Sequence, residues 1–163
     1  MVSLDVKALF PSLPMVKALK ILHNRLKNFK DLKYYTNLSV DEIIALVEVC
    51  VASPWFECER GIFLQQDGAP MGGPLSCLLA DMFMEEYENS IDFKIESAQI
   101  DNDWLRFRDD TWFIWRYSLE ALHSFIQYLN SIDPQIQWTY EVEKDNKINF
   151  PDVYVERKVD GTF

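Results

Sequence analysis

The sequence predicts an α+β fold in which helices pack on one face of a mostly antiparallel sheet. Short apolar or alternating runs typical of strands are interspersed with longer segments whose apolar residues recur every three or four positions, as in helices. In chain order these segments are a strand, two helices, a strand with a loop, a helix, a hairpin, a helix and two strands. The 163 residues are 48% hydrophobic and 26% charged, and no repeat or linker interrupts them, so we expect one domain over residues 1–163.

The chain begins with a strand and two helices. Residues 2–6 form an apolar run before a proline-rich turn, which is typical of a buried strand. Pro14 opens a helix, because its missing N–H is not needed in the first turn, and the apolar stripe of this helix is Met15, Leu19, Leu22, Leu26 and Phe29. Ser39 and Glu42 form a capping box that predicts the start of a second helix.

The middle of the chain contains its densest cluster of glycine and proline. Residues 61–65 are a short apolar run that predicts a strand, and it leads into this cluster at 68–74. A third helix follows, and its apolar stripe is Leu75, Leu78, Leu79, Met82, Phe83 and Tyr87.

Two aromatic runs, at 104–108 and 111–115, predict a hairpin. The residues between them are Asp109 and Asp110, so we expect two carboxylates at the hairpin tip. Ser118 can cap a fourth helix whose apolar stripe is Leu119, Leu122, Phe125, Ile126 and Leu129.

The last part of the chain predicts two more strands. Residues 136–143 alternate between apolar and polar, as in a strand with one buried face, and 152–158 is a further strand candidate. Asp160 and Gly161 are a hairpin turn signal with only two residues after them, so the sequence reads as a fragment of a larger protein. If the sheet edges at 1–6 and 152–158 are exposed, we expect the chain to self-associate.

Charge is distributed unevenly. The formal net charge of −10 argues against non-specific nucleic-acid binding, but residues 1–40 carry seven basic and two acidic side chains, a net of +5. The basic residues of the first helix are either a solvated face or a face that contacts phosphate; they are Lys17, Lys20, Arg25, Lys27 and Lys30.

Several protein classes are excluded by composition. The three cysteines are odd in number and lack CxxC spacing, and there are two histidines, which argues against a disulfide scaffold or structural zinc. No apolar run is long enough to span a membrane and no secretory signal is present. We therefore expect an intracellular protein, nuclear or cytoplasmic, with no membrane partner.

Three aspartates predict a metal site. Asp109 and Asp110 are adjacent, and two anions 4 Å apart repel by about 4 kcal/mol at an effective dielectric of 20, so a compensating cation is needed. Asp5 ends an apolar strand, and if that strand lies beside the hairpin the three carboxylates can hold two Mg²⁺ ions about 4 Å apart for phosphoryl transfer. The alternative is that the Asp pair serves turn chemistry alone.

Three ordered segments, residues 3–10, 68–75 and 106–110, resemble the palm motifs of reverse transcriptases. The resemblance is greatest to the Penelope-like retroelements and continues through residues 138–158, so that it spans nearly the whole chain. It implies a palm-like sheet, RNA-directed DNA polymerase activity, and an RNA or DNA template with primer and deoxynucleoside triphosphates as partners. It also implies two Mg²⁺ ions as cofactors, which Mn²⁺ could replace.

The resemblance implies roles for individual residues. Asp5, Asp109 and Asp110 match the catalytic, metal-binding aspartates, and Val6 matches the residue whose backbone carbonyl is a further metal ligand. The amides of Ala8 and Leu9 would face the nucleotide phosphates, and Phe10 matches the aromatic side chain that excludes a ribose 2′-OH. The loop beneath the template base and the incoming nucleotide would include Gly68, Met71, Gly72, Gly73 and Pro74.

The sequence departs from the family pattern at three positions. Phe107 replaces the usual tyrosine of the Asp-Asp box, Arg108 replaces a small or apolar residue, and Gly73 stands where serine is common. Arg108 could either pair with Asp109 or crowd the primer terminus. The fingers and thumb of the family would lie outside residues 1–163.

Two other functions remain open from sequence. The chain could be a catalytically inert, truncated or decayed reverse transcriptase fragment that acts at most as a binding module. A two-metal nuclease would share the carboxylates, but it would not explain Phe10 or the glycine-rich loop.

Overall fold

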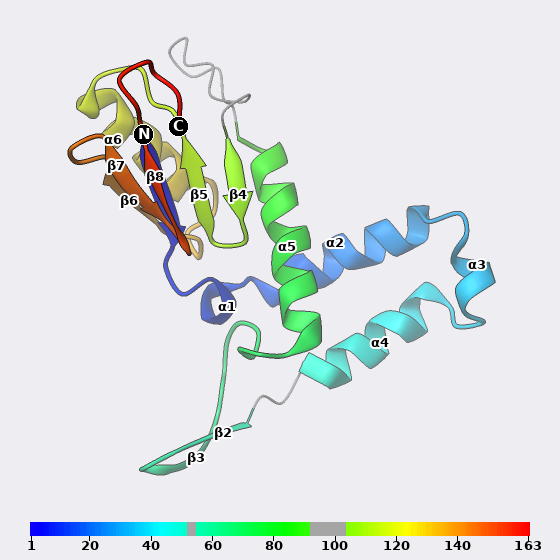
Figure 1. Cartoon of the computed structure of the whole chain (residues 1–163). Helices are drawn as coiled ribbons and strands as arrows, with labels where there is room; N and C mark the ends of the chain where they lie inside the picture. Colours follow the sequence, from blue (N-terminus) through cyan, green and yellow to red (C-terminus); the bar gives the residue numbers. More distant parts are fainter. Residues whose placement is uncertain (52–54, 92–103) are drawn as a thin grey trace. The chain divides into compact units, whose positions relative to one another are not determined.

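The structure is a computed structural model that describes residues 1–51, 55–91 and 104–163 (Figure 1). The chain divides into two compact units, one formed by Met1–Lys7 with Ser90–Phe163 and the other by Ala8–Asn89. Helices and antiparallel strands are mixed along the chain, which confirms the predicted α+β class.

The first unit is built on a four-stranded antiparallel sheet. In spatial order its strands are β4 (Leu105–Phe107), β5 (Asp110–Phe113), β1 (Val2–Val6) and β6 (Trp138–Val142). Because β5 and β6 both pair with β1, the N-terminal strand lies inside the sheet. The condition for self-association through an exposed edge at residues 1–6 is therefore not met, because β5 and β6 pair with both sides of β1.

One face of this sheet is the core of the unit. The strand register places Val2, Leu4 and Phe113 on the same face, where all three are buried. Helix α6 (Leu119–Ile132) contributes Phe125, whose ring lies 6.3 Å from that of Phe113. The predicted cap of this helix is confirmed, because the Ser118 hydroxyl accepts a hydrogen bond from the backbone N–H of Ala121 at 3.2 Å.

A second hairpin, formed by β7 (Lys147–Phe150) and β8 (Val153–Glu156), completes this unit. The Arg157 guanidinium donates hydrogen bonds to Glu143 at 2.5 Å and to the Asn146 side chain at 2.9 Å, which ties the end of β8 back to the start of the hairpin. The sequence predicted β8, within 152–158, but not β7.

The Ala8–Asn89 unit is mainly helical. Its elements are α1 (Leu9–Ser12), α2 (Met15–Asn28), α3 (Leu32–Tyr35), α4 (Val40–Val51), β2 (Trp55–Cys58), β3 (Gly61–Leu64) and α5 (Pro74–Asn89). Helix α2 packs against both α4 and α5 and buries Ala18 and Leu22. The predicted capping box is confirmed, because the Ser39 N–H donates to the Glu42 carboxylate at 2.7 Å and the Glu42 N–H donates to the Ser39 hydroxyl at 3.3 Å.

Helix length and cysteine pairing also bear on the class of protein. None of the helices in these three segments is long and apolar enough to cross a membrane. Cys50, Cys58 and Cys77 are free thiols, and the first two are exposed.

Candidate active site

Strand pairing brings the three predicted aspartates to one end of the four-stranded sheet. Asp5 on β1 lies directly opposite Asp110 on β5, and the Val6 N–H donates to the backbone carbonyl of Asp109 at 3.1 Å. Cβ atoms of directly opposed residues in an antiparallel pair lie about 4.5–5.5 Å apart. The convergence that sequence spacing alone could not establish is thus a consequence of the β1–β5 register.

The hairpin tip differs by one residue from the prediction. Asp110 belongs to β5 and pairs with Phe107, so the two-residue turn consists of Arg108 and Asp109. Arg108 adopts a positive φ of 59°, a conformation that is uncommon for residues other than glycine. Because Asp110 lies in the strand, its side chain shares a sheet face with Asp5, and turn chemistry alone does not account for it.

Partial burial and mutual repulsion both raise the pKa of carboxylates in this cluster, and burial has the larger effect. Partial burial, followed by the negative charge of Asp109, raises the pKa of Asp5 above its usual value. Partial burial and then the charges of Asp109 and Asp5 raise the pKa of Asp110 in the same direction. Among the described residues no lysine, arginine or histidine forms a salt bridge with any of these carboxylates, so the cluster has unbalanced negative charge.

A hollow of about 430 Å³ lies beside Asp5 and Asp110. Its other lining residues come from β1, β6 and the β7–β8 hairpin and are Ser3, Leu4, Thr139, Tyr140, Glu141, Asn149 and Pro151. The Thr139 hydroxyl donates to the backbone carbonyl of Asp5 at 3.3 Å, a further link between β6 and β1 at this hollow. The surface next to the carboxylates is therefore open and polar, as a site for a charged ligand must be.

The donor chemistry of this cluster fits a hard divalent cation, because carboxylate oxygens are the ligands that Mg²⁺ prefers. The unbalanced negative charge around Asp5 and Asp110 also favours binding of a cation. In the described part of the chain, however, no three His, Cys, Asp or Glu side chains are already arranged to hold a metal ion. The backbone thus positions the carboxylates, while their side chains are not in a coordinating arrangement.

The residues predicted to contact the nucleotide lie mainly in the Ala8–Asn89 unit. Ala8 precedes α1 with φ 49° and ψ 50°, the left-handed conformation that costs an alanine about 1–2 kcal/mol. Leu9 is buried and Phe10 is half-buried. Backbone strain of this kind clusters at functional sites, and here it falls on the residue whose amide is predicted to face phosphate.

The glycine-rich loop packs directly on Phe10 and Pro11. The Ala69 N–H donates to the Phe10 carbonyl at 2.8 Å, and Gly68 has φ +75°. A Cβ atom on Gly68 would lie 2.3 Å from the Pro11 carbonyl oxygen and 2.4 Å from that of Phe10. The contact therefore requires glycine, and it brings together two of the three sequence motifs.

The rest of this loop leads into α5. Gly72 has φ +81° with open space around it, Met71 is exposed, and Pro74 is the first residue of the helix. A Cβ atom on Gly73 would lie 2.8 Å from the Ser76 hydroxyl. Gly73 therefore lies close to the start of α5.

The two departures in the Asp-Asp box lie together on the hairpin. Phe107 is exposed and pairs with Asp110, on the sheet face that carries Asp5. The Arg108 guanidinium lies 6.0 Å from the centroid of the Phe107 ring, a cation–π arrangement, and is not in a salt bridge with Asp109.

The sequence did not identify all of the polar residues near the carboxylates. Thr139, Glu141 and Asn149 line the same hollow as Asp5. The alternation within 136–143 assigns Thr139 and Glu141 to one face of a strand, but only the pairing Asp5↔Thr139 and Ser3↔Glu141 places that face beside Asp5.

Comparison with known proteins identifies the fold. No family model and no curated protein sequence matches the chain. Among solved structures, apo telomerase from Candida tropicalis, truncated from its C-terminal domain, has a TM-score of 0.66 at 18% identity and covers 95% of this chain and 33% of that one.

Two telomerase structures in complex with a TWJ fragment of telomeric RNA also match. The protein from Candida albicans has a TM-score of 0.65 at 14% identity, covering 95% of this chain and 29% of its own. The Candida tropicalis complex has a TM-score of 0.60 at 17% identity, covering 91% and 27%. The chain thus spans a third or less of the length of these proteins, and its fold is similar to that of the part it matches.

Proposed function

We propose that the chain is the palm of an RNA-directed DNA polymerase of the Penelope-like retroelement type. It would transfer a nucleotidyl group from a deoxynucleoside triphosphate to the 3′-OH of a primer paired with an RNA or DNA template. The observation that carries this proposal is the placement of Asp5, Asp109 and Asp110 at one end of two paired strands, beside an open hollow. The telomerase neighbours, two of which are complexes with RNA, support a nucleic-acid partner.

In this proposal Asp5, Asp109 and Asp110, with the backbone carbonyl of Val6, hold two Mg²⁺ ions. When bound, such ions lower the pKa of an attacking hydroxyl and stabilise negative charge on the transferred phosphate. The residues themselves contribute an array of carboxylates that is fixed by β1–β5 pairing and has unbalanced charge before any ligand binds.

The remaining predicted residues would bind the nucleotide. The ring of Phe10 would exclude a 2′-hydroxyl, and its backbone is held by Ala69. The amides of Ala8 and Leu9 would donate to the triphosphate. The loop of Gly68, Met71, Gly72, Gly73 and Pro74 would lie beneath the template base, where small residues permit close backbone approach.

Isothermal titration calorimetry of the purified chain with Mn²⁺ and with Mg²⁺ tests the metal assignment. Binding should disappear in the double variant Asp5→Asn/Asp109→Asn. A matched control, Asp31→Asn/Asp152→Asn, removes two exposed carboxylates from other parts of the chain and should bind as the parent does. Equal binding by all three proteins would rule out the carboxylate site.

Primer extension on an RNA template tests the reaction. Asp109→Asn should abolish extension, because the neutral amide has the shape of the carboxylate but lacks the negative charge needed to hold a metal ion. Phe10→Ala should allow ribonucleotides to be incorporated, whereas Phe56→Ala, which changes an exposed aromatic ring elsewhere, should not. Unchanged nucleotide preference in Phe10→Ala would refute the role of Phe10.

A non-catalytic binding module is the alternative. Two observations favour it, namely the net charge of −10 and the absence of a preformed three-ligand group among the described residues. A folded chain that neither binds Mn²⁺ nor extends a primer would support this alternative and contradict the polymerase proposal.

A further inference from the structure

Figure 1 shows where α2 ends and α3 begins within the Ala8–Asn89 unit. The sequence at this junction carries basic and aromatic side chains. We call this junction the α2–α3 corner and define it by Lys27, Phe29, Lys30, Lys33, Tyr34 and Tyr35. The side chains of Tyr34 and Tyr35 are 88% and 78% exposed, and that of Phe29 is 46% exposed. These rings are far more accessible than aromatic side chains that stabilise a core.

The corner is positively charged although the whole chain is acidic. It has three lysines, and Asp31 is the one acidic residue between Lys27 and Tyr35. Within the described segments, none of the three ammonium groups is in a salt bridge with a carboxylate. At physiological ionic strength charges are screened over about 8 Å, so a ligand at the corner responds to these lysines more than to the net charge of −10.

The aromatic rings are held by local backbone structure. The Leu32 N–H donates to the Phe29 carbonyl at 3.2 Å and the Tyr34 N–H donates to the Asp31 carbonyl at 2.9 Å, which closes successive turns. The rings of Phe29 and Tyr35 lie 5.8 Å apart with an angle of 30° between their planes. The turn that carries these rings is thus structured, and Tyr34 and Tyr35 are largely exposed on it.

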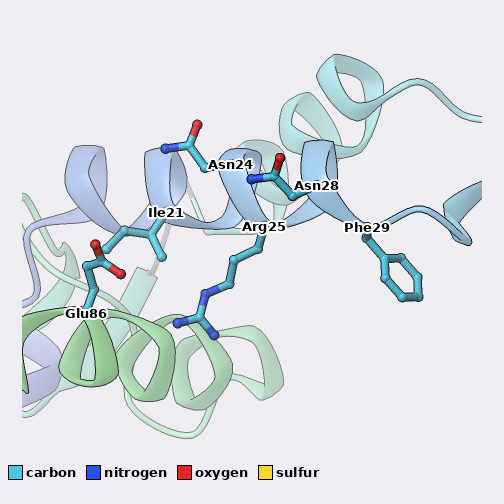
Figure 2. Close-up of a pocket in the computed structure, with 6 residues that line it drawn as sticks. All are labelled: Ile21, Asn24, Arg25, Asn28, Phe29 and Glu86. Atoms are coloured by element: carbon cyan, nitrogen blue, oxygen red, sulfur yellow. The ribbon is translucent and has the colours of Figure 1, made fainter. Parts of the chain in front are cut away.

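An open groove of about 440 Å³ continues from the corner along α2 (Figure 2). It is lined by Ile21, Asn24, Arg25, Asn28, Phe29 and Glu86. Figure 2 shows the Asn24 and Asn28 amides projecting from the same side of α2, while Arg25 extends toward α5, where it contacts Glu85 at 2.9 Å. The carboxylates of α5 repel phosphate from that wall, whereas the amides offer donors and acceptors to the edge of a base.

We infer that the α2–α3 corner binds single-stranded nucleic acid, with phosphates against Lys27, Lys30 and Lys33 and bases stacked on Tyr34 and Tyr35. Exposed rings interleaved with basic side chains are the arrangement by which proteins bind single strands, since every base has a face that can stack. An acidic peptide could pair with the lysines but would leave both tyrosine rings uncovered. A duplex keeps its bases stacked internally and could use only the lysines.

Fluorescence anisotropy with labelled oligo(U) and oligo(dT) 12-mers tests this inference on the full chain. Tyr34→Ala/Lys33→Gln should weaken binding about tenfold, because it removes one stacking platform and one phosphate contact. The matched control Tyr154→Ala/Lys158→Gln changes an exposed tyrosine, 70% accessible, and an exposed lysine in the other unit and should leave affinity unchanged. The two oligomers distinguish RNA from DNA as the preferred strand.

Salt dependence gives a second readout. Replacing Lys27, Lys30 and Lys33 with glutamine should reduce the slope of log K against log salt by about 2, since each phosphate contact on a single strand contributes about 0.7. Equal affinity of the corner variant and the control, or displacement of the oligomer by polyglutamate or duplex as readily as by single strands, would overturn the inference. Asp5→Asn/Asp109→Asn should retain binding at the corner, so failure of the proposed polymerase chemistry and failure of this inference give different results.

Discussion

Replacing Gly68 with alanine is expected to destabilise the Ala8–Asn89 unit by at least about 3 kcal/mol. The left-handed φ of +75° costs an alanine about 1 kcal/mol. The new Cβ would lie 2.3 and 2.4 Å from two backbone carbonyl oxygens, which cannot rotate away, so relief of this overpacking costs about 1–3 kcal/mol. The shift would also weaken the hydrogen bond from Ala69 to Phe10, worth about 1 kcal/mol.

Gly72→Ala is the control for this experiment. Gly72 has a similar φ of +81°, but no atom lies within 4 Å of the position its Cβ would take, so only the conformational cost of about 1 kcal/mol remains. Urea denaturation monitored by circular dichroism measures the free energy of unfolding of both variants. Equal destabilisation by the two substitutions would refute the close approach of the glycine-rich loop to Phe10 and Pro11.

Three further predictions follow from local geometry. Because burial and neighbouring charge raise the pKa of Asp110, its ionisation opposes folding, and stability falls as pH rises above the usual carboxyl pKa of 3.8. The variant Asp110→Asn should therefore have a higher melting temperature than the parent at pH 7 in EDTA. Differential scanning calorimetry should show that this difference vanishes near pH 3. Ser39→Ala should lower stability by about 1 kcal/mol in urea denaturation, since it removes the cap that accepts from Glu42, and an unchanged midpoint would contradict the capping box. Ala8→Gly should be neutral or stabilising and Ala8→Val destabilising by more than about 1 kcal/mol, because only glycine adopts φ 49° without strain; equal melting temperatures would argue against that conformation.

Elements with a clear periodicity were predictable from sequence. The apolar stripe after Pro14, the capping box at Ser39 and the alternation in 136–143 correspond to α2, α4 and β6. A single turn or two alternations give a weak pattern. The four-residue strands β3, β5 and β8 overlapped predicted runs, whereas the four-residue elements α1, α3, β2 and β7 were missed. Their conformation depends on neighbours that are distant in sequence.

The candidate site was predictable in composition but not in arrangement. The motifs around Asp5 and Asp109 identified the carboxylates, while the pairing of Asp5 with Asp110 depends on a register between segments far apart in the chain. Thr139 and Glu141 line the hollow because of a similar long-range register, that of β6 with β1. Similarly, the contact between Gly68 and Phe10 rests on tertiary packing that no local pattern encodes.

The central position of β1 has a consequence for how the chain folds during synthesis. Strand β1 pairs with β5 and β6, whose last residues are Phe113 and Val142, so during synthesis its pairing must wait until these later segments have been made. Contacts of such long sequence separation form slowly, whereas the Ala8–Asn89 unit can fold on contacts within its own continuous stretch. Translation that stops before β6 would therefore leave β1 unpaired on one side and exposed to association with other nascent chains.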